Sequence, residues 1–122
     1  MQLYRATSHT RFDLKYHLVW ITKYRKPVMT GRVVYRIREL VREICRTFSV
    51  QIIKGHVSKD HVHLFISMPP QLSVNKIAQY IKGKTSRRLM DEFPALKKTF
   101  LGQHFWARGY FAVSSGSVTD EM

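Results

Sequence analysis

Alternating apolar and polar positions along residues 61–68 predict a β-strand with one buried face. Every second residue is apolar, giving the set Val62, Leu64, Ile66 and Met68. Side chains at positions i and i+2 of a strand point to the same side. The intervening residues His61, His63 and Phe65 are therefore expected together on the other side. The pattern predicts one face that packs on a core and one face that is open.

Apolar residues with a period of 3.6 predict two helices. The first spans about 31–48, with an apolar stripe formed by Val33, Val34, Ile37, Leu40, Val41, Ile44, Cys45 and Phe48. The second begins after Ser73, whose side chain suits an N-cap, and closes at Phe93-Pro94. Each helix has one apolar side, which is typical of helices that pack on a sheet.

Three further stretches predict strands. Residues 14–22 are rich in aromatic and β-branched residues on both faces, which is typical of a central strand. Residues 50–57 should form an antiparallel hairpin with the histidine strand, because only residues 58–60 separate the two. A last strand is predicted at 105–113, with Gly109 as a bulge. The order strand, helix, strand, strand, helix, strand predicts an α+β, ferredoxin-like split βαβ fold, an antiparallel sheet with two helices on one face.

Length and composition narrow the class of protein. A chain of 122 residues suits one domain, and we expect residues 1–122 to form a single one. No apolar run approaches the roughly 18 residues of a membrane span, and the N-terminus lacks the apolar segment of a secretion signal. The single cysteine, Cys45, excludes an intramolecular disulfide framework and a cysteine-rich zinc finger.

The charge of the chain predicts a polyanionic partner. Lys and Arg number 21 against 8 Asp and Glu, which gives a net charge of +13. Such an excess attracts polyanions and gains affinity when phosphates release their counterions. A membrane surface is the competing polyanion, but the basic residues are spread over several elements and form no basic amphipathic helix. We therefore expect nucleic acid as the partner, and no membrane.

Basic residues beside aromatic residues, or along the second helix, are candidates for contacts with nucleic acid. They are Lys23, Arg25, Lys82, Lys84, Arg87, Arg88 and Arg108. Cations at these positions suit phosphates, and the aromatic neighbours suit stacking with splayed bases. Solvated charges and core aromatics explain the same pattern, so both interpretations stay open. Gly83-Lys84-Thr85 is not a P-loop, because the first glycine of that motif is absent.

His61 and His63 are the candidate metal ligands. Neutral imidazole is the commonest metal-binding side chain, and two imidazoles on one face of a rigid strand form a preorganised chelate. The alternative is that both are merely solvated on the polar face of an amphipathic strand. The acidic residue Asp60 directly before them and the Pro69-Pro70 stop after the strand favour a site.

Several motifs together resemble a known family. They are Tyr16-His17-Leu18-Val19-Trp20, Lys23-Tyr24-Arg25, Lys59-Asp60-His61-Val62-His63, Tyr80-Ile81-Lys82-Gly83-Lys84-Thr85-Ser86 and Phe105-Trp106-Ala107-Arg108-Gly109-Tyr110. With these motifs the chain resembles the small transposases of IS200-type insertion sequences, which are single-tyrosine members of the HUH endonuclease superfamily. The resemblance covers nearly the whole chain.

The resemblance implies a homodimer that binds single-stranded hairpin DNA at transposon ends. Such a protein would lie in the cytoplasm of a prokaryote, associated with the nucleoid. Such enzymes cut and rejoin single strands through a 5′-phosphotyrosine intermediate. His61 and His63 would correspond to the metal pair, with Mg²⁺ or Mn²⁺ as the cofactor. In the family the nucleophilic tyrosine lies on a helix after the last strand, which here would fall beyond Met122. We therefore expect no catalytic residue within the chain, which would bind DNA but not cut it.

Two other functions compete with this one. A purely nucleic-acid-binding module on the same fold, for DNA or RNA hairpins, would explain the charge and would keep its binding after both histidines were replaced. A metal enzyme of another class could also use the His-x-His pair, but the sequence offers no visible third ligand.

Overall fold

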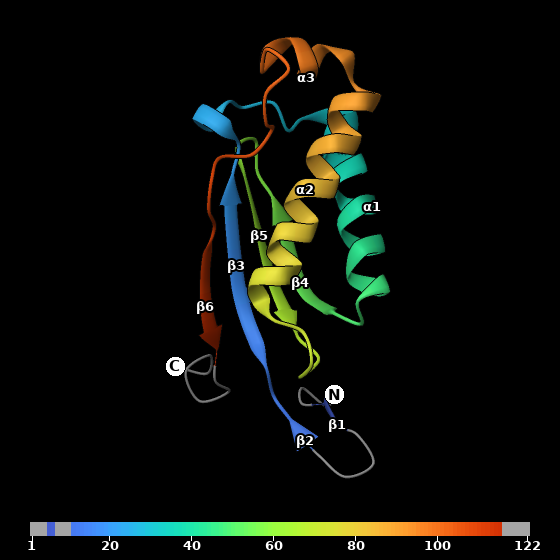
Figure 1. Cartoon of the computed structure of the whole chain (residues 1–122), viewed down its shortest axis with the longest axis vertical. Helices are drawn as coiled ribbons and strands as arrows, with labels where there is room; N and C mark the ends of the chain where they lie inside the picture. Colours follow the sequence, from blue (N-terminus) through green and yellow to red (C-terminus); the bar gives the residue numbers. More distant parts are fainter. Residues whose placement is uncertain (1–4, 7–10, 116–122) are drawn as a thin grey trace.

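The computed structural model describes residues 5–6 and 11–115. They form one layer of sheet and one layer of helix (Figure 1). The main sheet has four strands, in the order β4-β5-β3-β6 and antiparallel throughout: β3 (Lys15–Ile21), β4 (Gln51–Val57), β5 (His61–Ser67) and β6 (Phe111–Ser115). Helices α1 (Gly31–Thr47) and α2 (Val74–Glu92) cover one face. This is the predicted ferredoxin-like arrangement.

Smaller elements flank this frame. A short helix α3 (Pro94–Thr99) follows α2, and a 3₁₀ turn η1 (Lys23–Arg25) follows β3. Strands β1 (Arg5–Ala6) and β2 (Arg11–Phe12) pair with each other in a separate sheet, which the sequence did not predict. Strands of two residues are too short to show an alternating pattern, so no periodicity could reveal them.

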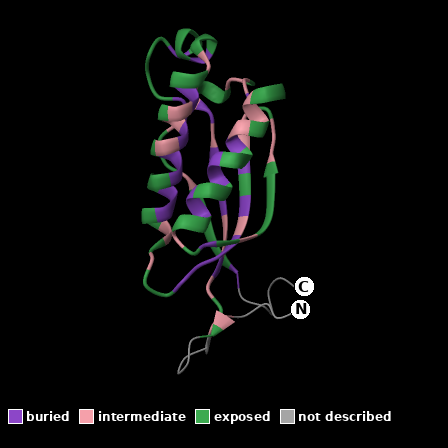
Figure 2. Cartoon of the chain, turned by 90° about the vertical axis from the view of Figure 1, so that its right-hand side faces the viewer, coloured by how far each residue is buried: buried purple, intermediate pink, exposed green. Residues whose placement is uncertain are grey.

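The core lies between the sheet and the two long helices. The residues of β5 that the alternation predicted to be buried are so, since Val62, Leu64 and Ile66 are at most 4% exposed; Ser67 at the end of the strand is buried as well. Figure 2 shows the buried residues lining the inner side of both helices and the strands behind them. Ser73 caps α2 as predicted, because its side chain accepts a hydrogen bond from the backbone N–H of Lys76 at 3.1 Å. The opposite face of the sheet carries His61 and His63.

The predicted last strand was misplaced. Residues 105–113 were expected to be extended, but the strand runs over 111–115, and residues 105–110 form a connection with a single bridge between Trp106 and Thr22. Phe105 and Trp106 are both buried although they are neighbours, which a regular strand with one packed face does not allow. Gly109 has φ +77°, a left-handed conformation that turns the chain rather than forming a bulge.

Candidate metal and nucleic-acid site

His61 and His63 lie on the face of β5 that is turned away from the helices. Val62 between them is fully buried, whereas His63 is exposed and His61 is partly exposed. The register pairs Ile21 of β3 with His61, and Val19 with His63. Both imidazoles therefore stand on a strand that is hydrogen-bonded on both sides, which holds their backbone in place.

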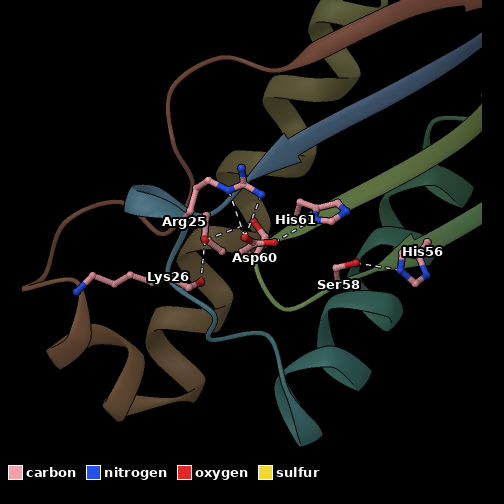
Figure 3. A network of polar contacts seen from close by, with 7 residues as sticks. Arg25, Lys26, His56, Ser58, Asp60 and His61 are labelled. Carbon is pink, nitrogen blue, oxygen red and sulfur yellow. Dashed lines mark hydrogen bonds and ion pairs between the residues drawn. The ribbon is translucent and has the colours of Figure 1, made fainter.

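Asp60 holds the ring of His61. The Nδ1 atom of His61 lies 3.0 Å from Oδ1 of Asp60, and Nε of Arg25 donates to Oδ2 of the same carboxylate at 3.2 Å (Figure 3). The hydrogen bond with His61, together with the nearby Arg25, lowers the pKa of Asp60, which stays ionised. Because a carboxylate can only accept, Nδ1 of His61 must carry a proton in this hydrogen bond. In the neutral imidazole, Nε2 of His61 then keeps its lone pair.

The second ring, that of His63, contacts a histidine from the neighbouring strand. Nδ1 of His17 lies 3.2 Å from Nε2 of His63. Burial against the sheet and, after it, the nearby His17 lower the pKa of His63. This shift favours the neutral imidazole, which is the form that binds metals.

Sequence reasoning missed His17 as a site residue. Its position in the first strand gives no sign of function, because a single histidine among apolar residues is ordinary. The signal would have been the register of β3 against β5, which sets His17 on the same face as the histidine pair. That register depends on tertiary structure.

The donor set is compatible with a divalent cation. In the part of the chain that the structure describes, no three His, Cys, Asp or Glu side chains are grouped to hold a metal. His56, opposite His63 on β4, has its Nε2 atom 2.9 Å from the hydroxyl of Ser58 (Figure 3). Two neutral imidazole nitrogens on an open face fit an ion that takes its other ligands from substrate oxygens and water.

Lys23 and Arg25 lie in the turn that follows β3. Tyr24 and Arg25 adopt left-handed conformations with φ of 59° and 53°, so the turn is tight. Tyr24 is 75% exposed, and the ammonium of Lys23 lies 5.4 Å from the centre of its ring. Lys23 also donates to Oε1 of Gln103 at 2.6 Å. Arg25 is joined to the histidine pair through Asp60, so the structure brings this basic turn next to His61.

A second basic region lies along α2. A groove of about 680 Å³ separates α2 from the segment 103–109, and its walls include Arg87 and Arg108. A neighbouring depression on α2 is lined by Lys84, Arg87 and Arg88. The structure thus gathers four of the predicted basic residues. Lys84, Arg87 and Arg88 lie on α2, in the helix layer, and Arg108 lies in the connection before β6 (Figure 1).

Lys82 does not face this groove as a free cation. Its side chain is only 9% exposed, and its ammonium donates to the backbone carbonyls of Ala107 at 2.9 Å and Gly109 at 2.6 Å. Burial lowers the pKa of Lys82. The ammonium thus holds the segment before β6, and phosphate binding by Lys82 stays a prediction. Arg88 remains at the surface, where its Nε donates to Glu92 at 3.0 Å.

Comparison with known proteins adds the family. The family model described as "Transposase IS200 like" matches residues 10–122. This chain belongs to the IS200-like transposase family. Members of the family are metal-dependent HUH transposases that use a tyrosine. No helix in the described part of this transposase is long and apolar enough to cross a membrane.

Curated relatives agree with this assignment. The transposases of insertion sequence IS200 from Salmonella typhimurium and Salmonella typhi are each 33% identical over 118 residues, which is 97% of this chain and 78% of the relative. The ISDra2 transposase TnpA of Deinococcus radiodurans is 33% identical over 99 residues, 81% of this chain and 71% of the relative.

Solved structures share the fold of this IS200-like chain. A crystal structure of a candidate transposase from Deinococcus radiodurans superposes with a TM-score of 0.82 at 27% identity, covering 96% of this chain and 89% of that one. A REP-associated tyrosine transposase bound to a REP hairpin gives a TM-score of 0.65 at 12% identity, covering 95% and 66%. At that identity the second match supports the fold alone.

Proposed function

We propose that this chain binds hairpin-forming single-stranded DNA at the ends of an insertion sequence and holds Mg²⁺ or Mn²⁺ between His61 and His63. The observation that carries the proposal is the placement of these two imidazoles on one open face of β5, each with one nitrogen already bonded to a protein neighbour. A bound divalent ion would polarise an oxygen of the phosphate to be cut.

The residues around the pair suit a phosphate. Asp60 accepts from both Arg25 and His61, so one carboxylate sets the position of a cation and of a metal ligand. The guanidinium of Arg25 has five N–H donors, and its side chain is 64% exposed, which leaves donors for a DNA phosphate beside the metal. This arrangement brings the phosphate, the metal and the positive charge to one end of the sheet.

The groove along α2 suits the backbone of the hairpin. Arg87 and Arg108 both line it, with Lys84 in the adjoining depression. Phosphates bound there would release counterions, and the net charge of +13 would attract the strand from a distance. We propose that this groove holds the hairpin while the histidine face holds the single strand to be cut.

We further propose that cleavage uses a tyrosine other than those in the described residues. Tyr16 lies on the same side of β3 as the buried Leu18, away from the histidines, and the hydroxyl of Tyr110 donates to Asn75 of α2 at 2.7 Å. Tyr35 and Tyr80 belong to helices on the far side of the sheet. Tyr24 lies in the turn after β3, where its ring faces the ammonium of Lys23 at 5.4 Å. By itself, then, the chain is proposed to bind without cutting, and to act as a homodimer.

Binding of Mn²⁺ and DNA by the whole chain tests the proposal. Calorimetry should detect an Mn²⁺ site in the wild type, and the double variant His61→Ala with His63→Ala should lose it. Fluorescence anisotropy should show that hairpin DNA binds more tightly than an unstructured strand or an RNA hairpin. If the double variant bound Mn²⁺ as the wild type does, the metal site would be refuted.

Covalent chemistry is tested with the same DNA. Wild-type protein, Mn²⁺ and a labelled hairpin with its flanking single strand are incubated and separated on a denaturing gel. We expect no protein–DNA adduct. An adduct that survives denaturation would show that a tyrosine of this chain does cut, and peptide mapping would identify it. A clear preference for the RNA hairpin would instead favour an RNA-binding module.

A further inference from the structure

His17 lies beside the proposed metal pair although no motif for metal binding contains it. It belongs to β3 and faces the open side of the sheet, and its ring lies flat against Phe65, with 4.4 Å between ring centres and 12° between planes. Its Nδ1 atom is 3.2 Å from Nε2 of His63. The imidazole is thus held by stacking on one side and by a ring nitrogen on another.

The contact between the two rings decides which nitrogen of His63 can bind a metal. A hydrogen bond between two neutral imidazoles needs one protonated and one unprotonated nitrogen. If Nε2–H of His63 donates to Nδ1 of His17, then Nδ1 of His63 carries the lone pair and is free to bind a metal. In the opposite arrangement Nδ1 of His63 carries the proton, and neither of its nitrogens is available.

The two histidines of the pair are therefore oriented in different ways. His61 is held at Nδ1 by Asp60, which leaves Nε2 as the ligand. His63 has its Nε2 against His17, so Nδ1 is the nitrogen left to bind a metal when Nε2 carries the proton. Outer partners of this kind set the tautomer and the ring orientation of metal-binding histidines.

We propose that His17 is a positioning residue for His63, accepting its Nε2–H so that Nδ1 of His63 binds the metal. The inference rests on the proposed metal function of His61 and His63. It assigns to β3 a part in the site that is otherwise formed by β5. In this role His17 is not itself a ligand, because its Nδ1 lone pair accepts the N–H of His63.

Substitutions at His17 separate hydrogen bonding from packing. His17→Phe keeps a flat ring that stacks on Phe65 but removes the acceptor, whereas His17→Asn places an amide oxygen close to where Nδ1 was. We expect the dissociation constant for Mn²⁺, measured by calorimetry, to rise about 10- to 100-fold in His17→Phe. In His17→Asn it should stay within about threefold of the wild type, because the acceptor is restored.

His56→Phe is the matched control. His56 flanks His63 from β4, on the opposite side from His17, but its own ring nitrogen contacts Ser58 rather than a proposed ligand. Removing it should leave Mn²⁺ affinity within about twofold of the wild type. If His56→Phe or His17→Asn weakened binding as much as His17→Phe, or if His17→Phe bound as the wild type does, the positioning role would be overturned.

A spectroscopic measurement on the wild type tests the same idea without a variant. With ¹⁵N-labelled histidine and Zn²⁺ as a diamagnetic probe, long-range ¹H–¹⁵N spectra should show metal on Nδ1 of His63 and on Nε2 of His61. Metal on Nε2 of His63 would refute the inference. Failure of the underlying metal site is distinguishable, because the wild type would then bind no better than His61→Ala with His63→Ala.

Discussion

Lys82 provides a direct test of the distinction between a structural and a DNA-binding lysine. Replacement by Met keeps the buried aliphatic stem and removes the ammonium that donates to the carbonyls of Ala107 and Gly109. Hydrogen bonds from a charged donor contribute about 1.5–3 kcal/mol each, but burial of the ammonium, which lowers its pKa, offsets part of this. We expect Lys82→Met to lower the free energy of unfolding by about 1.5–3 kcal/mol.

Urea denaturation followed by circular dichroism measures this change. Thermal unfolding should shift in parallel, by roughly 3–6 °C for each kcal/mol in a chain of this size. The matched control is Lys84→Met, two positions along α2, whose side chain lines the depression beside the groove. It should change stability by less than about 0.5 kcal/mol and weaken binding of hairpin DNA. If Lys82→Met were as stable as the wild type, the two carbonyl contacts would not be holding the segment.

Three further variants test the packing, the ion pairs and the groove. Glu92→Gln removes a carboxylate that accepts from Arg36 at 2.6 and 3.0 Å, contacts that lower the pKa of Glu92. At pH 7 the free energy of unfolding should fall by about 0.5–1 kcal/mol. Because the pKa of Glu92 is lower in the folded protein than in the unfolded chain, the difference should shrink as the pH falls from the ordinary glutamate value of 4.5 through the lowered folded value. A constant difference down to about pH 2 would contradict this. Trp106→Phe removes the indole N–H that donates to the buried hydroxyl of Thr85 at 2.9 Å. Urea denaturation should show that the free energy of unfolding falls by about 1–3 kcal/mol. An unchanged urea midpoint would count against the hydrogen bond. Arg87→Ala should weaken hairpin binding. It should also reduce the magnitude of the slope of the log binding constant against the log salt concentration by about 0.7–0.9. An unchanged slope would exclude a phosphate contact there.

The fold was predictable because its elements carry strong local patterns. The apolar residues of α1 and the alternating apolar residues of β5 each lie on one face of their element. Both faces are buried in the structure, which confirms the two predictions. The last strand was placed too early because Phe105 and Trp106 are strand-forming residues that here pack inward one after the other. Their backbone and side-chain partners include Thr22, Thr85 and Ser86, all distant in sequence.

The candidate site was predictable only where its residues are neighbours in sequence. His61 and His63 share a face because strand geometry alone demands it. Nothing in the sequence separates Lys82 from Lys84, since both occupy one basic run of α2. Only the packing of residues 105–109 against that helix buries the first and leaves the second partly exposed.

By itself, the sequence of this IS200-like chain determined the order of its elements, its positive charge and the pairing of two histidines on one strand face. These properties depend on residues close together along the chain, where period and composition are enough. Tertiary structure alone decided that His17 meets His63, that Asp60 joins Arg25 to His61, and that Arg87 and Arg108 line one groove. Such contacts depend on strand register and on helix packing, which bring together residues separated by tens of positions.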